Sequence, residues 1–214
     1  MQPIDWARTM NVDLVDRLEA DLTAGRLRPG EWLRQADIEE MYGATRFDVR
    51  TALMDLRARY LIEHIPNRGY RVIDLSERER EELIDTRVVL EAAAARLAAG
   101  RASRDDIREL EEIVQEFERQ MHEVEVAALR QLNARFHDRF YAISGNQILT
   151  ERIRALRQRG LPGPRSRGWR SIAAIEQSHQ DHVQMVRLLK ARDAENLGEL
   201  VHDHLNRFRQ FNLI

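Results

Sequence analysis

Hydrophobic residues recur every three or four positions along most of the chain, which is the spacing of one buried face of an α-helix. Near the N-terminus, Val15, Leu18 and Leu22 follow this spacing. Gly25 and Gly43 interrupt it, and glycine is typical of a helix end. The first 60 residues are therefore expected to form three short helices, which cover 11–24, 35–42 and 46–59.

The spacing changes between residues 60 and 73. Two short apolar runs, 60–65 and 70–73, flank the turn sequence Pro66-Asn67-Arg68-Gly69. Two such runs around a short turn predict a β-hairpin, here with a basic tip. Two short helices joined by a tight turn and followed by a hairpin have the order of a winged helix-turn-helix.

From residue 76 onward the pattern is helical again. Ser76 with Glu79, and Ser103 with Asp106, have the spacing of capping boxes, which open helices. The predicted helices of this region cover 77–99, 104–122, 126–143, 147–158, 171–191 and 193–212.

One segment breaks this helical region. Residues 159–169 include five Gly or Pro, so we expect a loop there. The predicted fold is mainly α: a winged helix-turn-helix domain with a small β-hairpin over 1–74, and an all-helical bundle of about six helices over 75–214.

The composition excludes several kinds of site. The 214 residues include no Cys, so disulfides, thiolate nucleophiles and Cys-based metal sites are excluded. No apolar run approaches the ~18 residues of a membrane span, and the N-terminus lacks the basic start and apolar stretch of a signal peptide. We expect a cytoplasmic protein that does not bind membranes.

The formal net charge of −2 argues against nucleic-acid binding when the whole chain is considered. Residues 43–71, however, hold six Arg against three acidic residues. Arg46 and Arg50 are four positions apart, so they share a face at the start of the predicted third helix, where guanidinium groups suit phosphates and guanine edges. Arg68 at the hairpin tip is placed to enter a minor groove. The alternative is that these are ordinary solvated charges, and the order of the elements favours DNA binding.

Residues 25–76, GRLRPGEWLRQADIEEMYGATRFDVRTALMDLRARYLIEHIPNRGYRVIDLS, resemble the DNA-binding domain of the GntR family of bacterial transcription regulators. The resemblance implies DNA contacts from the recognition helix and from the wing. The corresponding residues here are Thr45, Arg46 and Arg50 on the helix and Asn67, Arg68 and Gly69 on the wing, to which we add Arg34 and Phe47.

Two positions depart from the family pattern. Phe47-Asp48 replaces the usual small hydroxyl residue and Pro or Thr, and Ala36 stands where relatives often have Arg. Phe47 suits contact with a thymine methyl group, whereas Asp48 would repel phosphate if it faced DNA. The operator sequence therefore cannot be taken from relatives.

The helical region directs several histidines inward. The spacing places His137, His179, His182 and His204 on the apolar faces of three predicted helices, and Asn133 lies four positions before His137. Neutral imidazoles with an oxygen ligand suit Zn, Ni, Mn or a similar divalent ion. The alternative is that each is a hydrogen-bonded core residue.

Residues 76–212 resemble the FCD effector domain of the FadR subgroup of GntR regulators, in the pieces 85–99, 132–146 and 180–205. Many such domains hold a divalent metal with an Asp, a His four residues later and two further His. The corresponding positions are Asn133, His137, His182 and His204. Because the amide of Asn133 brings no charge, we expect weaker metal binding than in relatives.

Arg87 lies on the predicted inward stripe of the helix over 77–99 and needs an anion there. A buried acidic neighbour is one candidate. The other is the carboxylate of an effector, a kind of ligand that relatives often sense. If the partner is the effector carboxylate, Arg87 and His179 belong to the effector site.

These observations favour a ligand-responsive DNA-binding repressor without enzymatic activity. Its expected partners are a double-stranded operator, a small carboxylate effector and a second copy of the chain. A metalloenzyme using His137, His182 and His204 is the alternative, but no acidic residue has the spacing of a general base. A helical interaction protein would leave the hairpin and the inward Arg and His unexplained.

Overall fold

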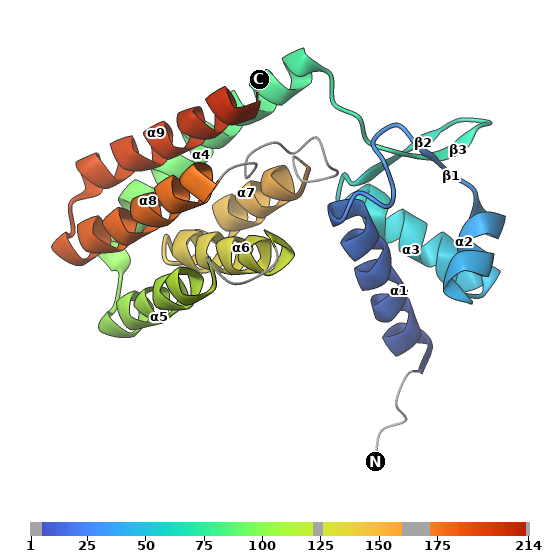
Figure 1. Ribbon diagram of the computed structural model, residues 1–214, viewed down its shortest axis with the longest axis horizontal. Helices are drawn as coiled ribbons and strands as arrows, with labels where there is room; N and C mark the ends of the chain where they lie inside the picture. The colour runs from blue at the N-terminus through green and yellow to red at the C-terminus, as the bar shows by residue number, and fades with distance from the viewer. Residues whose placement is uncertain (1–5, 122–125, 160–171, 213–214) are drawn as a thin grey trace. The chain divides into compact units, whose positions relative to one another are not determined.

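The computed structural model describes residues 6–121, 126–159 and 172–212, and they form two compact units (Figure 1). Of the described residues, the first unit holds those up to Ser76 together with Arg157–Arg159, and the second holds the others from Glu77 onward. The first unit contains α1 (Trp6–Thr23), β1 (Trp32–Leu33), α2 (Gln35–Tyr42), α3 (Arg46–Ala58), β2 (Ile62–Ile65) and β3 (Gly69–Val72).

The core of the first unit forms where α1 and α2 pack on α3. The inward face of α3 is fully buried and consists of Val49, Ala52, Leu53 and Leu56, and the helix predicted over 46–59 is confirmed. Because these side chains hold α3 from one side, the opposite face of the helix is exposed to solvent.

The predicted hairpin of β2 and β3 is confirmed, and a third strand extends it. The strands are antiparallel in the order β1-β3-β2, with Trp32 opposite Arg71 in the β1–β3 pair. The two-residue strand β1 was not predicted, because its two residues are too few to show an alternating pattern. It attaches the segment before α2 to the wing.

The second unit is a bundle of the helices α4 (Glu77–Arg101), α5 (Arg104–Gln120), α6 (Val126–Ala142), α7 (Gln147–Arg159), α8 (Ile172–Ala191) and α9 (Ala194–Asn212). In Figure 1, α4, α8 and α9 lie side by side, and α5 lies beside α6. Small buried residues of α4, among them Ala94, Ala95 and Ala98, share a core with Leu197 and Val201 of α9. These short side chains permit the close packing of α4 along α9.

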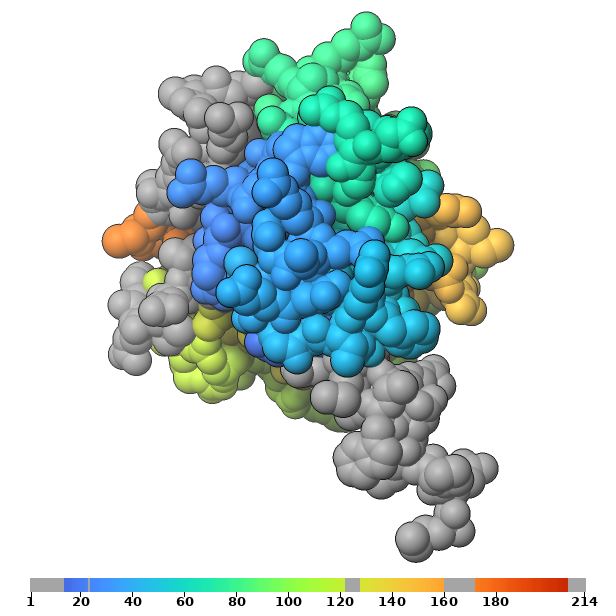
Figure 2. Space-filling view, turned by 90° about the vertical axis from the view of Figure 1, so that its right-hand side faces the viewer, coloured from blue at the N-terminus to red at the C-terminus, as the bar shows by residue number. Residues whose placement is uncertain are grey.

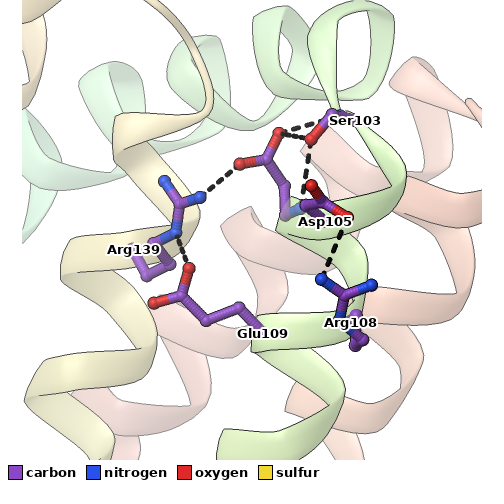
Figure 3. A network of polar contacts seen from close by, with 6 residues as sticks. Ser103, Asp105, Arg108, Glu109 and Arg139 are labelled. Carbon is purple, nitrogen blue, oxygen red and sulfur yellow. Dashed lines mark hydrogen bonds and ion pairs between the residues drawn. The ribbon is translucent and has the colours of Figure 1, made fainter.

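A polar network ties α5 to α6 (Figure 3). The predicted capping box at the start of α5 is confirmed, since Ser103 Oγ accepts a hydrogen bond from the Asp106 N–H over 3.1 Å and the Asp106 carboxylate accepts one from the Ser103 N–H over 2.8 Å. Arg139 of α6 donates to Glu109 over 2.6 Å and also pairs with Asp106. One arginine thus binds two carboxylates on the first two turns of α5.

One position in the bundle departs from the helical spacing, and one predicted loop lies mostly outside the described residues. Leu97 shares the helical spacing of Arg87 on α4, which would place it on the inward face, but it is 38% exposed, and Glu91 is buried on that face instead. Of the predicted loop over 159–169, Arg159 ends α7 and the remaining residues lie outside the described part of the chain. Among the described helices, none combines the length and the apolarity that crossing a membrane requires.

Candidate functional site

The exposed face of α3 carries the residues that the sequence assigned to DNA recognition. Thr45, Arg46, Phe47 and Arg50 are all exposed around the first turns of this helix. Phe47 is 72% exposed, so its apolar ring is available for contact with a ligand. Figure 2 looks onto the first unit, where atoms of α2 and its neighbouring segments, in blue to cyan, lie at the surface. The exposed residues at the start of α3 are therefore accessible to a large ligand.

The cap of α3 accounts for Asp48. Thr45 Oγ1 accepts a hydrogen bond from the Asp48 N–H over 3.2 Å and donates one to the Asp48 carboxylate over 2.5 Å. The carboxylate is therefore held at the helix start by the Thr45 hydroxyl. The same contact occupies the Thr45 hydroxyl. A hydrogen bond from this hydroxyl to DNA, as predicted, would therefore compete with its capping of α3.

Ion pairs divide the six arginines of residues 43–71 into two groups. Arg59 pairs with Glu19 and Asp55 at 2.9 and 3.0 Å, and Arg71 pairs with Glu63 at 2.5 Å. The other four form no ion pair with any described residue, and all four are exposed. This uncompensated group consists of Arg46, Arg50, Arg57 and Arg68.

The wing turn has the conformation that its residues favour. Asn67 and Gly69 have positive φ values of 63° and 98°, which Asn and Gly tolerate best. The Arg68 N–H closes the turn on the Ile65 carbonyl at 3.0 Å. Arg34, the residue just before α2, is exposed as well. The predicted wing residues are thus at the surface of the first unit.

Three of the predicted metal ligands come together in the second unit. One ring nitrogen from each of His137 on α6, His182 on α8 and His204 on α9 lies within 4.8 Å of the others. The Nε2 atoms of His137 and His182 are 3.1 Å apart. His137 and His182 are each only 1% exposed. Three converging imidazole nitrogens in a buried site are a donor set that suits Zn or Ni.

Aromatic rings surround this histidine cluster. Phe136 stacks on His182 with ring centroids 4.2 Å apart, and Tyr141 stacks on His137 at 5.8 Å. Both aromatic residues are 1% exposed. These ring contacts restrict the orientations of the imidazoles.

A carboxylate that the sequence did not suggest supports the cluster. Asp181 accepts hydrogen bonds from His204 Nδ1 and from Arg207 at 2.8 Å each, and from Gln177 at 3.0 Å. Burial alone would raise the pKa of Asp181, but the hydrogen bonds from His204 and Arg207 outweigh it and lower the pKa to about 2. The signal in the sequence was a charged residue beside His182 on the inward side of α8.

Asn133, the predicted fourth ligand, lies one helical turn before His137 on α6 and is half-buried. Its role as a ligand remains a prediction. A neutral amide there leaves the four proposed ligands without a formal charge.

Arg87 has a buried acidic partner. Its Nε donates to Glu91 Oε1 over 2.7 Å, and the Tyr141 hydroxyl donates to Glu91 Oε2 over 2.5 Å. Glu91 is completely buried, and Arg87 is 9% exposed. Of the two anions that the sequence left open, the internal carboxylate is present. The spacing of Arg87 and Glu91, four apart on one helix, was the signal for it.

His179 is buried on α8 but stands apart from the histidine cluster. Its ring stacks on Phe117 with centroids 5.8 Å apart, and Phe117 meets His182 edge-on at 6.1 Å. Burial lowers the pKa of His179, and the nearby Glu118 opposes this only in part. Its predicted contact with an effector remains a prediction.

Comparisons with known proteins agree with the two units. The family model described as "FCD domain" matches residues 82–207, and "Bacterial regulatory proteins, gntR family" matches residues 11–72. The chain is 25% identical to the Nta operon transcriptional regulator of Aminobacter aminovorans over 180 residues, 84% of this chain and 83% of that one. It is 27% identical to the HTH-type transcriptional repressor GlaR of Escherichia coli over 197 residues, which cover 88% and 89% of the two chains. The solved structure of E. coli McbR/YncC has the same fold, with a TM-score of 0.80 at 22% identity over 95% of this chain and 96% of that one.

Proposed function

Because the chain belongs to the gntR family of bacterial regulatory proteins and carries an FCD domain, it is a ligand-responsive DNA-binding transcription regulator, and we propose that it is a dimeric repressor released by a small carboxylate. The similarity to the repressor GlaR supports repression over activation. The relatives named above are transcription regulators and give no support to the metalloenzyme alternative.

The observation that carries the DNA contact is the pair Arg46 and Arg50. Both are exposed at the N-terminal end of α3, have no acidic partner among the described residues and share one face of the helix. A recognition helix contacts base edges from its N-terminal residues in the major groove. Phe47 between them offers an apolar surface to a thymine methyl group.

A second copy of the chain would double this contact. Dimeric helix-turn-helix proteins read two half-sites about 34–36 Å apart. The proposal therefore includes an operator with two-fold symmetry, one half-site for each copy.

The histidine cluster fits a divalent metal ion. His137, His182 and His204 would hold it with imidazole nitrogens, and Asn133 would add an amide oxygen. Such an ion would supply a positive charge that can bind a carboxylate ligand. Arg87 uses Nε for Glu91, so the other guanidinium nitrogens are not part of that ion pair and are candidates for a second contact to the effector.

An effector can release DNA only if it binds one arrangement of the protein better than the other. The experiment has two parts. Fluorescence anisotropy with the DNA upstream of the protein's own gene, against an unrelated fragment of equal length, tests sequence-specific binding. Elemental analysis of protein purified without chelators, followed by titration of small carboxylates into the DNA complex, tests the metal and the effector. Equal affinity for both fragments would refute sequence-specific binding and with it the proposed repressor. Absence of metal would refute only the metal site.

A further inference from the structure

A surface hollow of about 560 Å³ lies beside the wing of the first unit. The side chains that shape it include Trp32 of β1, Arg34, and His64, Arg68 and Tyr70 of the hairpin. Arg34 and Arg68 are both exposed, and no acidic residue lines the hollow. This surface suits an anionic group.

Trp32 orients one of these two arginines. The Arg68 guanidinium carbon lies 4.5 Å from the centroid of the Trp32 ring, which is the distance of a cation–π contact. Trp32 itself is half-buried and fixed in the sheet opposite Arg71. A second cation, Arg71, lies 5.6 Å from the same ring, but Glu63 neutralises it. Arg68 has no acidic partner among the described residues, so the indole ring is the contact that restrains it.

Stacking leaves the binding groups of Arg68 free. A guanidinium that lies over an aromatic ring uses its face, while its N–H donors point outward around its edge. An exposed arginine that is already ordered loses less side-chain freedom when it binds a ligand than one that is free to rotate. The ring can therefore increase affinity for an anion without touching it.

We propose that Trp32 is a positioning residue for DNA binding, which holds Arg68 beside Arg34 and so forms a site for one phosphate of the DNA backbone. This inference rests on the DNA contact by the wing in the proposed function. The ligand is a backbone phosphate because the hollow adjoins the wing and presents two guanidinium groups at the surface of the first unit. Bases would be read by α3, whereas this site would contribute affinity at any sequence.

A double-mutant cycle tests the inference on the full-length protein. The variants Trp32→Leu, Arg68→Ala and the double variant are titrated with the operator fragment by fluorescence anisotropy. Trp32→Leu is expected to weaken binding by about two- to fivefold, because Arg68 would then lose its side-chain freedom on binding. The double variant should bind no more weakly than Arg68→Ala, because Trp32 acts only through Arg68. Trp32→Phe should restore most of the affinity.

A second measurement separates positioning from folding. The Arg68 side-chain protons should show a ring-current shift by NMR in the wild type, which Trp32→Leu removes and Trp32→Phe partly keeps. If Trp32→Leu does not fold, Trp32→Met replaces it in the cycle.

Three results would overturn the inference: wild-type affinity in Trp32→Leu, additive losses in the double variant, or an unshifted Arg68 in the wild type. Suppose that Arg68→Ala binds the operator as well as the wild type, while Arg46→Ala loses binding. This result would overturn the inference on Trp32 and the wing contact, but α3 would remain the DNA-reading helix. Absence of specific binding by the wild type would refute the proposed function itself.

Discussion

Asp181 accepts a hydrogen bond from Nδ1 of His204 over 2.8 Å. This bond fixes the tautomer of His204 and leaves Nε2 as the nitrogen available to the histidine cluster. A carboxylate in this position also makes the imidazole a stronger ligand, because it stabilises positive charge on the ring.

Asp181→Asn is therefore expected to weaken Zn²⁺ binding by about 10- to 100-fold, the usual effect of removing such a supporting group. Competition with a chromophoric chelator measures the affinity. Asp203→Asn is the matched control, since Asp203 is exposed and contacts His202, which is outside the cluster. Equal affinity in Asp181→Asn and Asp203→Asn would contradict the supporting role of Asp181.

Removal of the Glu91 carboxylate should strongly destabilise the second unit. Glu91→Ala leaves the buried Arg87 guanidinium without its partner, and breaking a buried ion pair costs about 3–5 kcal/mol. Tyr141→Phe removes only one hydrogen bond to Glu91 and should cost about 1 kcal/mol. Urea unfolding gives both values, with Glu112→Ala on the exposed face of α5 as the control. Similar losses in Glu91→Ala and Glu112→Ala would show that the pair is not needed for folding.

The capping box of α5 predicts a pH dependence. Burial alone would raise the pKa of Asp106, but hydrogen bonds from Ser103 and the charge of Arg139 outweigh it and lower the pKa below its ordinary value of 3.8. Because the folded pKa is the lower one, the stabilisation is complete above 3.8 and is lost as the pH falls toward the folded pKa.

Urea unfolding between about pH 6 and about pH 2 measures this dependence. Asp106→Asn should remove part of the acid-induced loss of stability. Asp105→Asn should not, because Asp105 is largely exposed and its described ion pair with Arg108 is a surface one. If the Asp106→Asn and wild-type curves are parallel over this range, the lowered pKa is wrong. Ser103→Ala should cost about 1 kcal/mol in the free energy of unfolding at neutral pH.

Arg46→Ala and Arg50→Ala should each reduce operator binding by about 1–3 kcal/mol, the value of one good contact to a base. Arg108→Ala removes the same charge from an exposed position in the second unit and serves as the control. Anisotropy titration at one fixed salt concentration gives the comparison. Unchanged curves for both α3 variants would exclude the docking of this helix on DNA.

The helices could be predicted because each buries an apolar stripe with a strong period. The stripe of Val49, Leu53 and Leu56 determined not only α3 but also which of its residues face outward. The inward placement of the histidines was predicted equally well, because an imidazole is easily recognised among the apolar residues of a stripe. His137, His182 and His204 therefore meet in the structure as expected from three separate helices.

Buried acidic residues could not be predicted in this way. Glu91 and Asp181 lie on inward faces, but the spacing of apolar residues does not show which acidic residue pairs with a buried cation or imidazole. Their burial depends on partners from other helices, Tyr141 on α6 for Glu91 and His204 on α9 for Asp181. The contact of Trp32 with Arg68 was equally hidden, because it requires β1 to pair with the distant strand β3.

The division of the arginines affects how the protein would search DNA. Each phosphate that a protein neutralises releases counterions, and the logarithm of the binding constant falls by about 0.9 per phosphate for each tenfold rise in salt. With Arg59 and Arg71 already paired, four uncompensated arginines remain in residues 43–71, a small number for a DNA-binding surface. Such a protein would dissociate readily from random chromosomal DNA at cellular salt. Its residence on the chromosome would then depend on the bases that it reads.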